Sequence, residues 1–167
     1  MTALVIRDAE QGDIPALALI YDHYIAHSTA LFLDELVGQQ VITDKLANLA
    51  APDRFLVAEA DGLVLGYAAS GAYRPRPLYD VRELSIYLAP DAAGKGVGRA
   101  LYEPLIAALD EAGVHSLVGV VALPNEASEA LHRNLGFRHV GTMEGLGHKF
   151  GQRIDCSYWQ RMNPMPH

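Results

Sequence analysis

The chain has 167 residues, 50% of them hydrophobic and 20% charged, which excludes a disordered chain and predicts one domain with a sizeable core. A net charge of −7 argues against a general nucleic-acid surface, and no stretch approaches the ~20 apolar residues of a membrane span. The single cysteine, Cys156, excludes a disulfide framework and fits a reducing cytoplasm. We expect one domain over residues 1–162, a tail over 163–167, and neither a nucleic-acid nor a membrane partner.

The first expected elements are a strand over residues 3–7 and a long helix. Asp13 is typical of a helix N-cap, and Pro15 suits the first helical turn. Apolar residues then recur at helical spacing, at Ile14, Leu17, Tyr21 and Ile25.

Two histidines on this helix, His23 and His27, stand four residues apart and could share a metal ion. The zinc-protease pattern needs a glutamate directly after the first histidine, and Tyr24 holds that position. Paired histidines are more often surface or pocket residues, so we expect no metal site.

A connector over residues 28–35 and a second helix that includes 43–49 come next. Strands are expected over 55–60 and 63–73, because Asp61-Gly62 between them is a strong signal for a tight hairpin. The two prolines within residues 74–77 then predict a loop, since they preclude regular strand pairing.

The central stretch is typical of a strand, a glycine-rich turn and a helix. Residues 82–89 alternate apolar side chains, and a helical apolar pattern runs over 96–112. Glycines occupy alternate positions at the junction, at Gly94, Gly96 and Gly98. Glycines let backbone N–H groups approach a ligand closely, and the helix start adds a partial positive charge. The arrangement therefore favours a pocket for an anion, with pyrophosphate as the leading candidate.

Three cofactors could supply that pyrophosphate. A dinucleotide site needs G-x-G-x-x-G and an acidic residue about 20 positions on, whereas this turn is G-x-G-x-G and no acid lies near Val114. A nucleoside triphosphate loop needs Ser or Thr after its lysine, and Gly96 follows Lys95. Coenzyme A is the third candidate.

The C-terminal part predicts another strand, a helix and two closing strands. Residues 115–122 form a continuous apolar run, which is typical of a strand buried on both faces. Asn125 is a favourable N-cap for a helix that ends near Leu135. The closing strands are expected over 137–143 and 154–162.

Four stretches in order carry a specific pattern: E-L-S-I-Y-L at 83–88, G-K-G-V-G-R at 94–99, L-P-N-E-A-S-E-A-L-H-R-N-L-G-F at 123–137, and H-K-F-G-Q-R-I-D-C-S-Y-W-Q at 148–160. They resemble motifs of the GNAT superfamily of N-acetyltransferases, and within it the phosphinothricin and methionine-sulfoximine acetyltransferase branch. The resemblance implies an α/β (α+β) fold with a central mixed, mostly antiparallel, twisted sheet of about seven strands flanked by about four helices.

The same resemblance implies an acetyl-CoA-dependent N-acetyltransferase that acts on the amine of a small molecule, an amino acid or an analogue, and a homodimer. Glu83 then corresponds to the general base, since a carboxylate on an apolar strand is costly unless it is bonded or functional. His132 corresponds to the group that protonates the leaving thiolate, with Tyr87 and Tyr102 as other possible donors.

The implied cofactor contacts come from the central strand, the glycine loop and the fourth helix. The strand's backbone polarises the thioester carbonyl and pairs with the pantetheine arm. The contacts are Ile86, Tyr87, Leu88, Gly94, Lys95, Gly96, Val97, Gly98, Arg99 and Asn125. Ala93 departs from the family loop, where Arg or Gln is usual, and this removes one side-chain contact to pyrophosphate.

The implied acceptor contacts are Phe32, Arg76, Tyr79 and Lys149. In the connector, Leu31 and Leu33 replace an Asn and an Arg of the branch, which indicates a more apolar acceptor than phosphinothricin. Two alternatives stay open: a catalytically silent acyl-CoA-binding or sensing module, and a protein N-terminal or lysine acetyltransferase.

Overall fold

The structure is a computed structural model that describes residues 3–74 and 81–164. Within these residues seven strands form one sheet in the order β1-β2-β3-β4-β5-β7-β6. Neighbouring strands are antiparallel except β4 and β5, which are parallel. The strands are β1 (Val5–Asp8), β2 (Phe55–Ala60), β3 (Leu63–Ala72), β4 (Val81–Leu88), β5 (Ser116–Ala122), β6 (Arg138–Lys149) and β7 (Gln152–Met162). The mixed, mostly antiparallel sheet expected from the sequence is confirmed.

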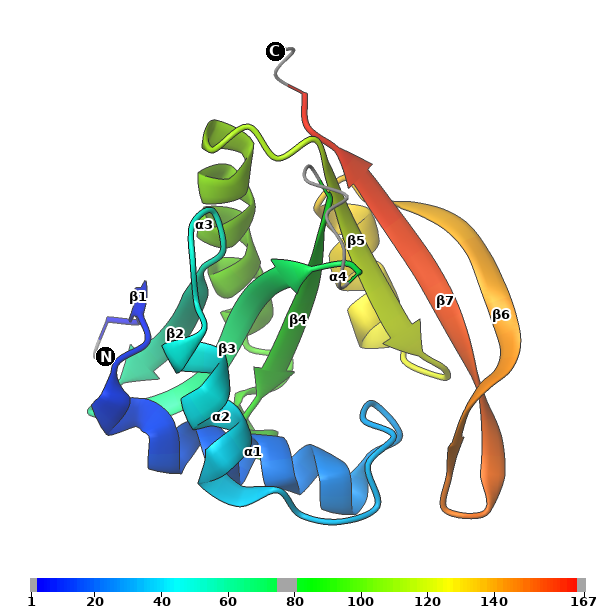
Figure 1. Cartoon of the computed structure of the whole chain (residues 1–167), viewed down its shortest axis with the longest axis horizontal. Coiled ribbons are helices and arrows are strands. Elements are labelled where there is room, and N and C mark those ends of the chain that lie inside the picture. The colour runs from blue at the N-terminus through cyan, green and yellow to red at the C-terminus, as the bar shows by residue number, and fades with distance from the viewer. Residues whose placement is uncertain (1–2, 75–80, 165–167) are drawn as a thin grey trace.

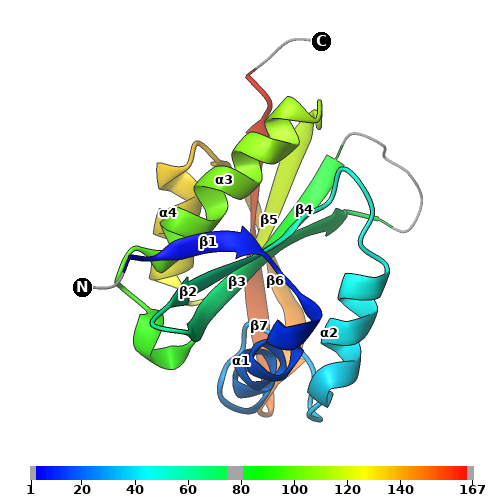
Figure 2. The same ribbon diagram turned by 90° about the vertical axis from the view of Figure 1, so that its left-hand side faces the viewer.

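Four α-helices of the described residues cover this sheet: α1 (Ile14–His27), α2 (Gly38–Ala47), α3 (Val97–Glu111) and α4 (Glu126–Asn134). Figures 1 and 2 show α1 and α2 on one face of the sheet and α3 and α4 on the other. Within residues 3–74 and 81–164, no helix combines the length and the apolar character needed to cross a membrane.

Alternating residues of β2 contribute to two apolar clusters, one on each face of the sheet. Leu56 and Ala58 belong to the cluster that packs under α3, whereas Phe55 and Val57 belong to the cluster under α1 and α2. Since successive side chains of a strand point to opposite faces, one apolar strand supports both layers. The sheet is therefore a rigid platform with a helix pair on each face.

The sheet opens between its two parallel strands. β4 and β5 pair from Val81↔Ser116 to Leu84↔Gly119, and no pairing follows. Beyond that point the strands diverge, with α1 and the connector below the opening (Figure 1). The facing backbone edges of the last residues of β4 and β5 are therefore left without a strand partner.

Two local predictions are confirmed in detail. Asp61 and Gly62 have φ values of 53° and 74°, the left-handed pair that a two-residue hairpin of this kind requires. The side chain of Asn125 accepts a hydrogen bond from the Ser128 N–H at 3.1 Å and so caps α4.

Two other predictions need correction. Asp13 does precede α1, but its carboxylate does not cap the helix, because it accepts from the Arg7 guanidinium at 2.7 and 2.8 Å and from the Glu10 N–H. β6 runs on to Lys149 instead of ending at Met143. Its pairing with β7 shifts register twice, and such bulges hide a long strand from a simple alternation pattern.

Candidate active site

The opening between β4 and β5 leads into a cavity of about 670 Å³, here called the cofactor cavity. Its walls come from the end of β4, the end of β5, the start of α3, α4 and the connector. Of the residues that the sequence singled out, it is lined by Phe32, Glu83, Ile86, Tyr87, Leu88, Gly94, Gly96, Gly98, Arg99, Asn125 and His132. The fold therefore gathers most of the expected site in one place.

The glycine turn has the backbone conformation that only glycine adopts readily. Gly94 and Gly96 have φ values of +74° and +80°, and Gly96 is the N-cap of α3. A Cβ on Gly98 would lie 3.4 Å from the Leu131 side chain, so that position is also close-packed. Since all three glycines line the cavity and the N–H groups of a first helical turn have no helical partner, this turn is a candidate anion site.

Two members of the expected loop do not line this cavity. Val97 is 3% exposed and packs in the core under α3. Lys95 is exposed on the turn and is not part of the cavity lining. Arg99 does line the cavity, and its Nε donates to the Glu103 carboxylate at 2.6 Å on the exposed face of α3.

Two backbone N–H groups near the end of β4 point toward the opening between β4 and β5. The Ala89 N–H donates to the Leu65 carbonyl on β3, so alternation directs the N–H groups of Ile86 and Leu88 to the opposite edge. The Leu88 N–H donates to the Tyr24 hydroxyl at 3.3 Å. Tyr24, which the sequence analysis did not single out for this site, therefore belongs to the cavity wall, and its tyrosine-rich helix face gave no specific signal.

His132 is 2% exposed and lies among aromatic rings. Its Nδ1 lies 2.8 Å from the Ser128 carbonyl oxygen, so Nδ1 carries the proton in that contact. Its Nε2 has no hydrogen-bond partner and sits beside Gly119, where a Cβ would lie 2.3 Å from it. Burial lowers the pKa of His132, although the Ser128 contact opposes this effect. The ring is therefore neutral near pH 7, with an unprotonated Nε2.

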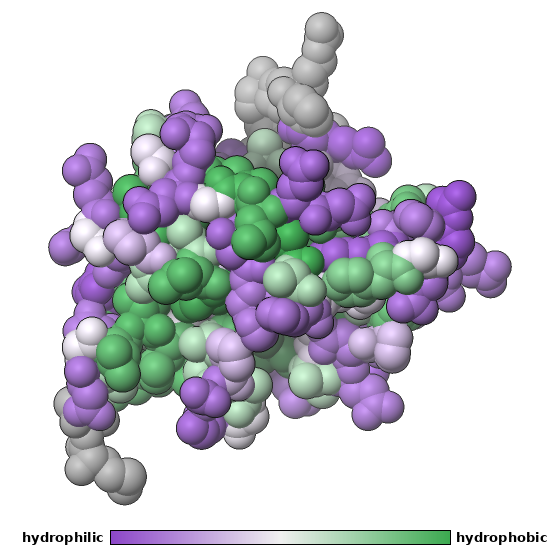
Figure 3. Space-filling view, turned by 90° about the horizontal axis from the view of Figure 1, so that it is seen from below, coloured by the Kyte–Doolittle hydropathy of each residue, from purple (hydrophilic) through white to green (hydrophobic). Residues whose placement is uncertain are grey.

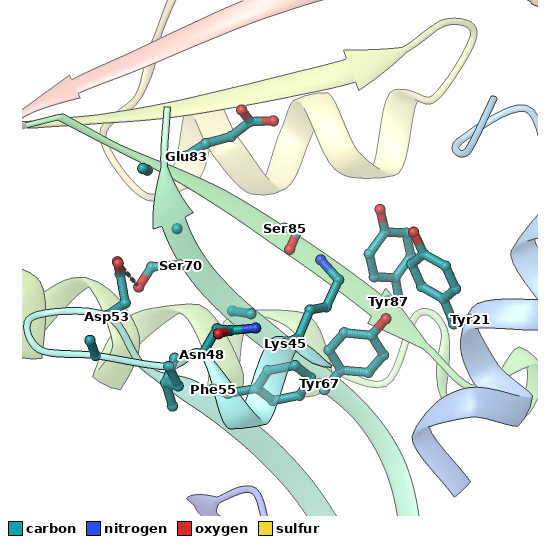
Figure 4. A pocket seen from close by; sticks show the side chains of 15 residues that line it. Tyr21, Lys45, Asn48, Asp53, Phe55, Tyr67, Ser70, Glu83, Ser85 and Tyr87 are labelled. Atoms are coloured by element: carbon teal, nitrogen blue, oxygen red, sulfur yellow. Dashed lines mark hydrogen bonds between the residues drawn. The ribbon is translucent and has the colours of Figure 1, made fainter. Parts of the chain in front are cut away.

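A second cavity of about 550 Å³ lies on the other side of β4, between α2, β3 and β4, and is here called the acceptor cavity. Figure 4 shows Lys45 extending from α2 toward β4, where Ser85 and Tyr87 lie, with Glu83 farther along the same strand. Glu83, Ser85 and Tyr87 line both cavities. These three side chains of β4 therefore join the two spaces.

Glu83 is half-buried, and burial raises the pKa of its carboxyl above the ordinary range of glutamate. The positive charges of Lys45 and Arg74 act in the opposite direction. No ion pair of Glu83 is present within the described residues. A carboxylate with a raised pKa beside two cavities has the properties of a general base.

Lys149 lies away from both cavities, although the sequence placed it against the acceptor. It is 1% exposed, and its ammonium donates to the carbonyl oxygens of Ile25 and Leu31 at 2.5 and 2.6 Å. Its donors are therefore used inside the protein. The two remaining expected acceptor residues, Arg76 and Tyr79, lie outside the described residues.

A glycine turn at a helix start, a splayed parallel strand pair and a shared carboxylate fit the class of acyl-CoA-dependent transferases that the sequence indicated. Residues 17–137 match the family model described as "Acetyltransferase (GNAT) family". The match spans most of the chain, and it includes the glycine turn, β4 and α4. The chain belongs to the GNAT family of acetyltransferases.

Named relatives indicate the branch of the family to which this chain is similar in sequence. The chain is 36% identical over 162 residues to phosphinothricin N-acetyltransferase of Streptomyces viridochromogenes, covering 96% of this chain and 88% of the relative. It is 37% identical over 160 residues to L-methionine sulfoximine/L-methionine sulfone acetyltransferase of Pseudomonas aeruginosa, covering 93% and 92%. These relatives confirm the branch that the four motifs indicated.

A solved acetyltransferase from Salmonella typhimurium, determined with its cofactor acetyl-CoA, superposes with a TM-score of 0.91 at 33% identity and covers 96% of this chain and 94% of its own. The GNAT fold expected from the sequence is confirmed. The protein is thus an N-acetyltransferase whose cofactor is acetyl-CoA. The glycine turn, the free edge of β4 and the volume of the cofactor cavity fit that molecule.

Proposed function

We propose that this enzyme acetylates the amine of a small molecule of the amino-acid class, with Glu83 as the general base. The observation that carries the proposal is the position of Glu83 on the shared wall of the two cavities, with a raised pKa. The names of the relatives, which act on phosphinothricin and methionine sulfoximine, support the substrate class.

Glu83 accepts the proton that an ammonium group must lose before its nitrogen can attack. A raised pKa brings the carboxylate closer to the pKa of the amine and makes this transfer less uphill. Acetyl-CoA, when bound, supplies the thioester, so that a carbon–nitrogen bond forms as the carbon–sulfur bond breaks and coenzyme A leaves as the thiol. The Ile86 N–H, on the free edge of β4, is the donor we assign to the carbonyl oxygen.

For the cofactor's phosphates we assign the backbone of Gly94, Gly96 and Gly98, with Lys95 and Arg99 as exposed cations nearby. Asn125 lines the same cavity while it caps α4. Ala93 also lines the cavity. Since it replaces the Arg or Gln that is usual in the family, it leaves space at this point of the cavity and supplies no side-chain contact to the pyrophosphate.

The leaving thiolate needs a proton, and two kinds of residue compete for that role. His132 must first become charged to donate from Nε2, and its burial opposes this. Tyr102 and Tyr87 line the cofactor cavity and are protonated at neutral pH, so each has a proton to give, although burial raises the pKa of both hydroxyls and makes them weaker acids. We therefore favour a tyrosine as the donor, with His132 as the second candidate.

We also propose that residues 1–162 form one domain, since both apolar clusters share one sheet, and that the enzyme is a cytoplasmic homodimer. Apolar side chains are exposed on the segment between α1 and α2 and on the β6–β7 hairpin, namely Leu33, Leu36, Leu146 and Phe150. Figure 3 shows apolar surface interspersed with polar surface on the face seen from below. Light scattering during size-exclusion chromatography tests the dimer, and a single monomeric peak contradicts it.

Thiol release from acetyl-CoA tests the proposed function. The panel contains free amino acids, phosphinothricin, methionine sulfoximine, aryl amines and short peptides, with product identified by mass spectrometry. We expect turnover with amino acids or their analogues. Turnover only with peptides indicates a protein acetyltransferase instead. Silence across the panel, with acetyl-CoA still raising the melting temperature, indicates a silent binding module.

A further inference from the structure

Gly147, on β6, lies where no side chain would fit. Its φ is outside the left-handed region, so the backbone itself would accept any L-residue at this position. A Cβ atom on Gly147 would instead meet the ring of Phe32, with Cδ1 at 2.8 Å and Cε1 and Cζ closer still. The Phe32 ring therefore packs directly on the backbone of Gly147, in the space that a side chain would occupy.

The same face of the β6–β7 hairpin contacts the connector at a second point. Gly147 and Lys149 are both buried and lie two positions apart on β6, so they face the same side of the strand. Lys149 donates to the carbonyl oxygen of Leu31, the residue before Phe32. Figure 1 shows the hairpin beside the loop that follows α1. Two consecutive residues of the connector thus contact two alternate positions of β6.

Phe32 also forms part of the wall of the cofactor cavity. It lines that cavity from the connector, whereas Ile86 and Leu88 line it from β4. Phe32 is 40% exposed, so burial in a core does not fix its ring. Connecting segments are in general more mobile than the elements they join. A cavity wall built on the connector therefore depends on the contacts that hold the ring from its other side.

The three glycines of β6 differ in what they contribute. Gly145 has a φ of +58°, a conformation that glycine adopts most readily. A Cβ on Gly141 would meet no atom within 4 Å. At Gly147 the backbone is ordinary and the space is taken by a residue of the cofactor cavity. The missing side chain of Gly147 is therefore linked to the position of Phe32 and not to the path of the strand.

We propose that Gly147 is a positioning residue for acetyl-CoA. Its backbone supports the Phe32 ring, and the supported ring keeps the connector wall at the separation from β4 that the cofactor needs. This inference concerns cofactor binding and goes beyond the proposed function. The groups assigned to the chemistry, Glu83 and the Ile86 N–H, lie on β4, so displacement of the connector weakens binding of the cofactor and leaves the chemical step in place.

The test is a double-mutant cycle measured by calorimetric titration with coenzyme A, which needs no acceptor. Gly147→Ala is expected to raise the Kd of coenzyme A about tenfold, because the new methyl group displaces the Phe32 ring. Phe32→Ala should weaken binding to a similar extent. In the Phe32→Ala background, Gly147→Ala should change the Kd by less than about twofold, since no ring remains to be displaced. Gly141→Ala is the control and should bind as the wild type does.

Steady-state kinetics with an acceptor that is turned over separate positioning from chemistry. Gly147→Ala should raise the KM for acetyl-CoA and keep kcat within about threefold of the wild type. Three outcomes overturn the inference: an unchanged Kd in Gly147→Ala, an equal loss of affinity with and without the Phe32 ring, or wild-type binding by Phe32→Ala. The last outcome decides the matter even where Gly147→Ala does not fold, because Phe32 is partly exposed and its replacement leaves both apolar clusters intact.

Discussion

The Nζ atom of Lys149, near the end of β6, lies 2.6 Å from the carbonyl oxygen of Leu31 and 2.5 Å from that of Ile25. Ile25 belongs to the last turn of α1, where carbonyl groups lack helical partners and carry partial negative charge. The ammonium therefore ties the β6–β7 hairpin to α1 and to the connector. Since Leu31 and Phe32 line the cofactor cavity, this contact positions part of its wall.

Lys149→Met is expected to lower the free energy of unfolding by about 2 kcal/mol, because two buried carbonyls lose their donor. It is also expected to raise the KM for acetyl-CoA, because the connector, which lines the cofactor cavity with Leu31 and Phe32, is no longer held. Urea unfolding and steady-state kinetics measure the two effects. Arg153→Met removes an exposed cation from the same hairpin and is expected to do neither. Equal behaviour of the two variants would show that the Lys149 contacts contribute nothing.

Glu83→Gln is expected to retain acetyl-CoA binding and to lose most turnover at neutral pH, since the amide cannot accept the proton. In the wild type, kcat/KM should fall as the pH drops through the raised pKa of Glu83, at a pH above the ordinary glutamate range. A pH–rate profile and a titration with acetyl-CoA check both points.

The stability of the Glu83→Gln variant supplies an independent check. A folded-state pKa above the unfolded value means that the charged carboxylate disfavours folding, and this cost is present at pH values above the raised pKa. The variant, which carries no charge, should melt at or above the wild-type temperature at pH 7. A much lower melting temperature would mean that Glu83 is a structural anchor.

Gly119→Ala is expected to displace His132, because the new Cβ would fall 2.3 Å from Nε2. We expect a loss of about 1–3 kcal/mol in stability and weaker acetyl-CoA binding, since His132 lines the cofactor cavity. Gly141→Ala on β6 is the matched control, because a Cβ there meets no atom within 4 Å. Denaturant unfolding and cofactor titration decide the matter, and wild-type behaviour of Gly119→Ala contradicts the packing described for His132.

Tyr102→Phe and His132→Gln separate the two candidates for the thiolate proton. If Tyr102 donates, its phenylalanine variant loses kcat and retains KM for acetyl-CoA. His132→Gln should then change cofactor affinity more than kcat. The reverse pattern assigns the proton to His132. Both variants require a thermal-unfolding control, because both side chains are buried.

Several local features of the fold could be predicted from the sequence alone. The hairpin at Asp61-Gly62, the Asn125 cap and the left-handed Gly94 and Gly96 each follow from what one residue type allows its own backbone to do. The order of motifs was enough to indicate the family and its sheet, because each motif keeps its place relative to its neighbours in the chain. Glu83 was singled out for the same reason.

Only the tertiary structure decided which distant groups meet. Lys149 bonds inside the protein and does not contact the acceptor cavity, because Ile25 of α1 and Leu31 of the connector, 124 and 118 residues away in the chain, pack over it. Lys45 stands on an exposed helix surface with no sequence signal, and it faces β4 because α2 packs on that side of the sheet. The neutral state of His132 follows from the rings and the strand that bury it. These outcomes depend on how helices dock on the sheet, and no local pattern encodes that docking.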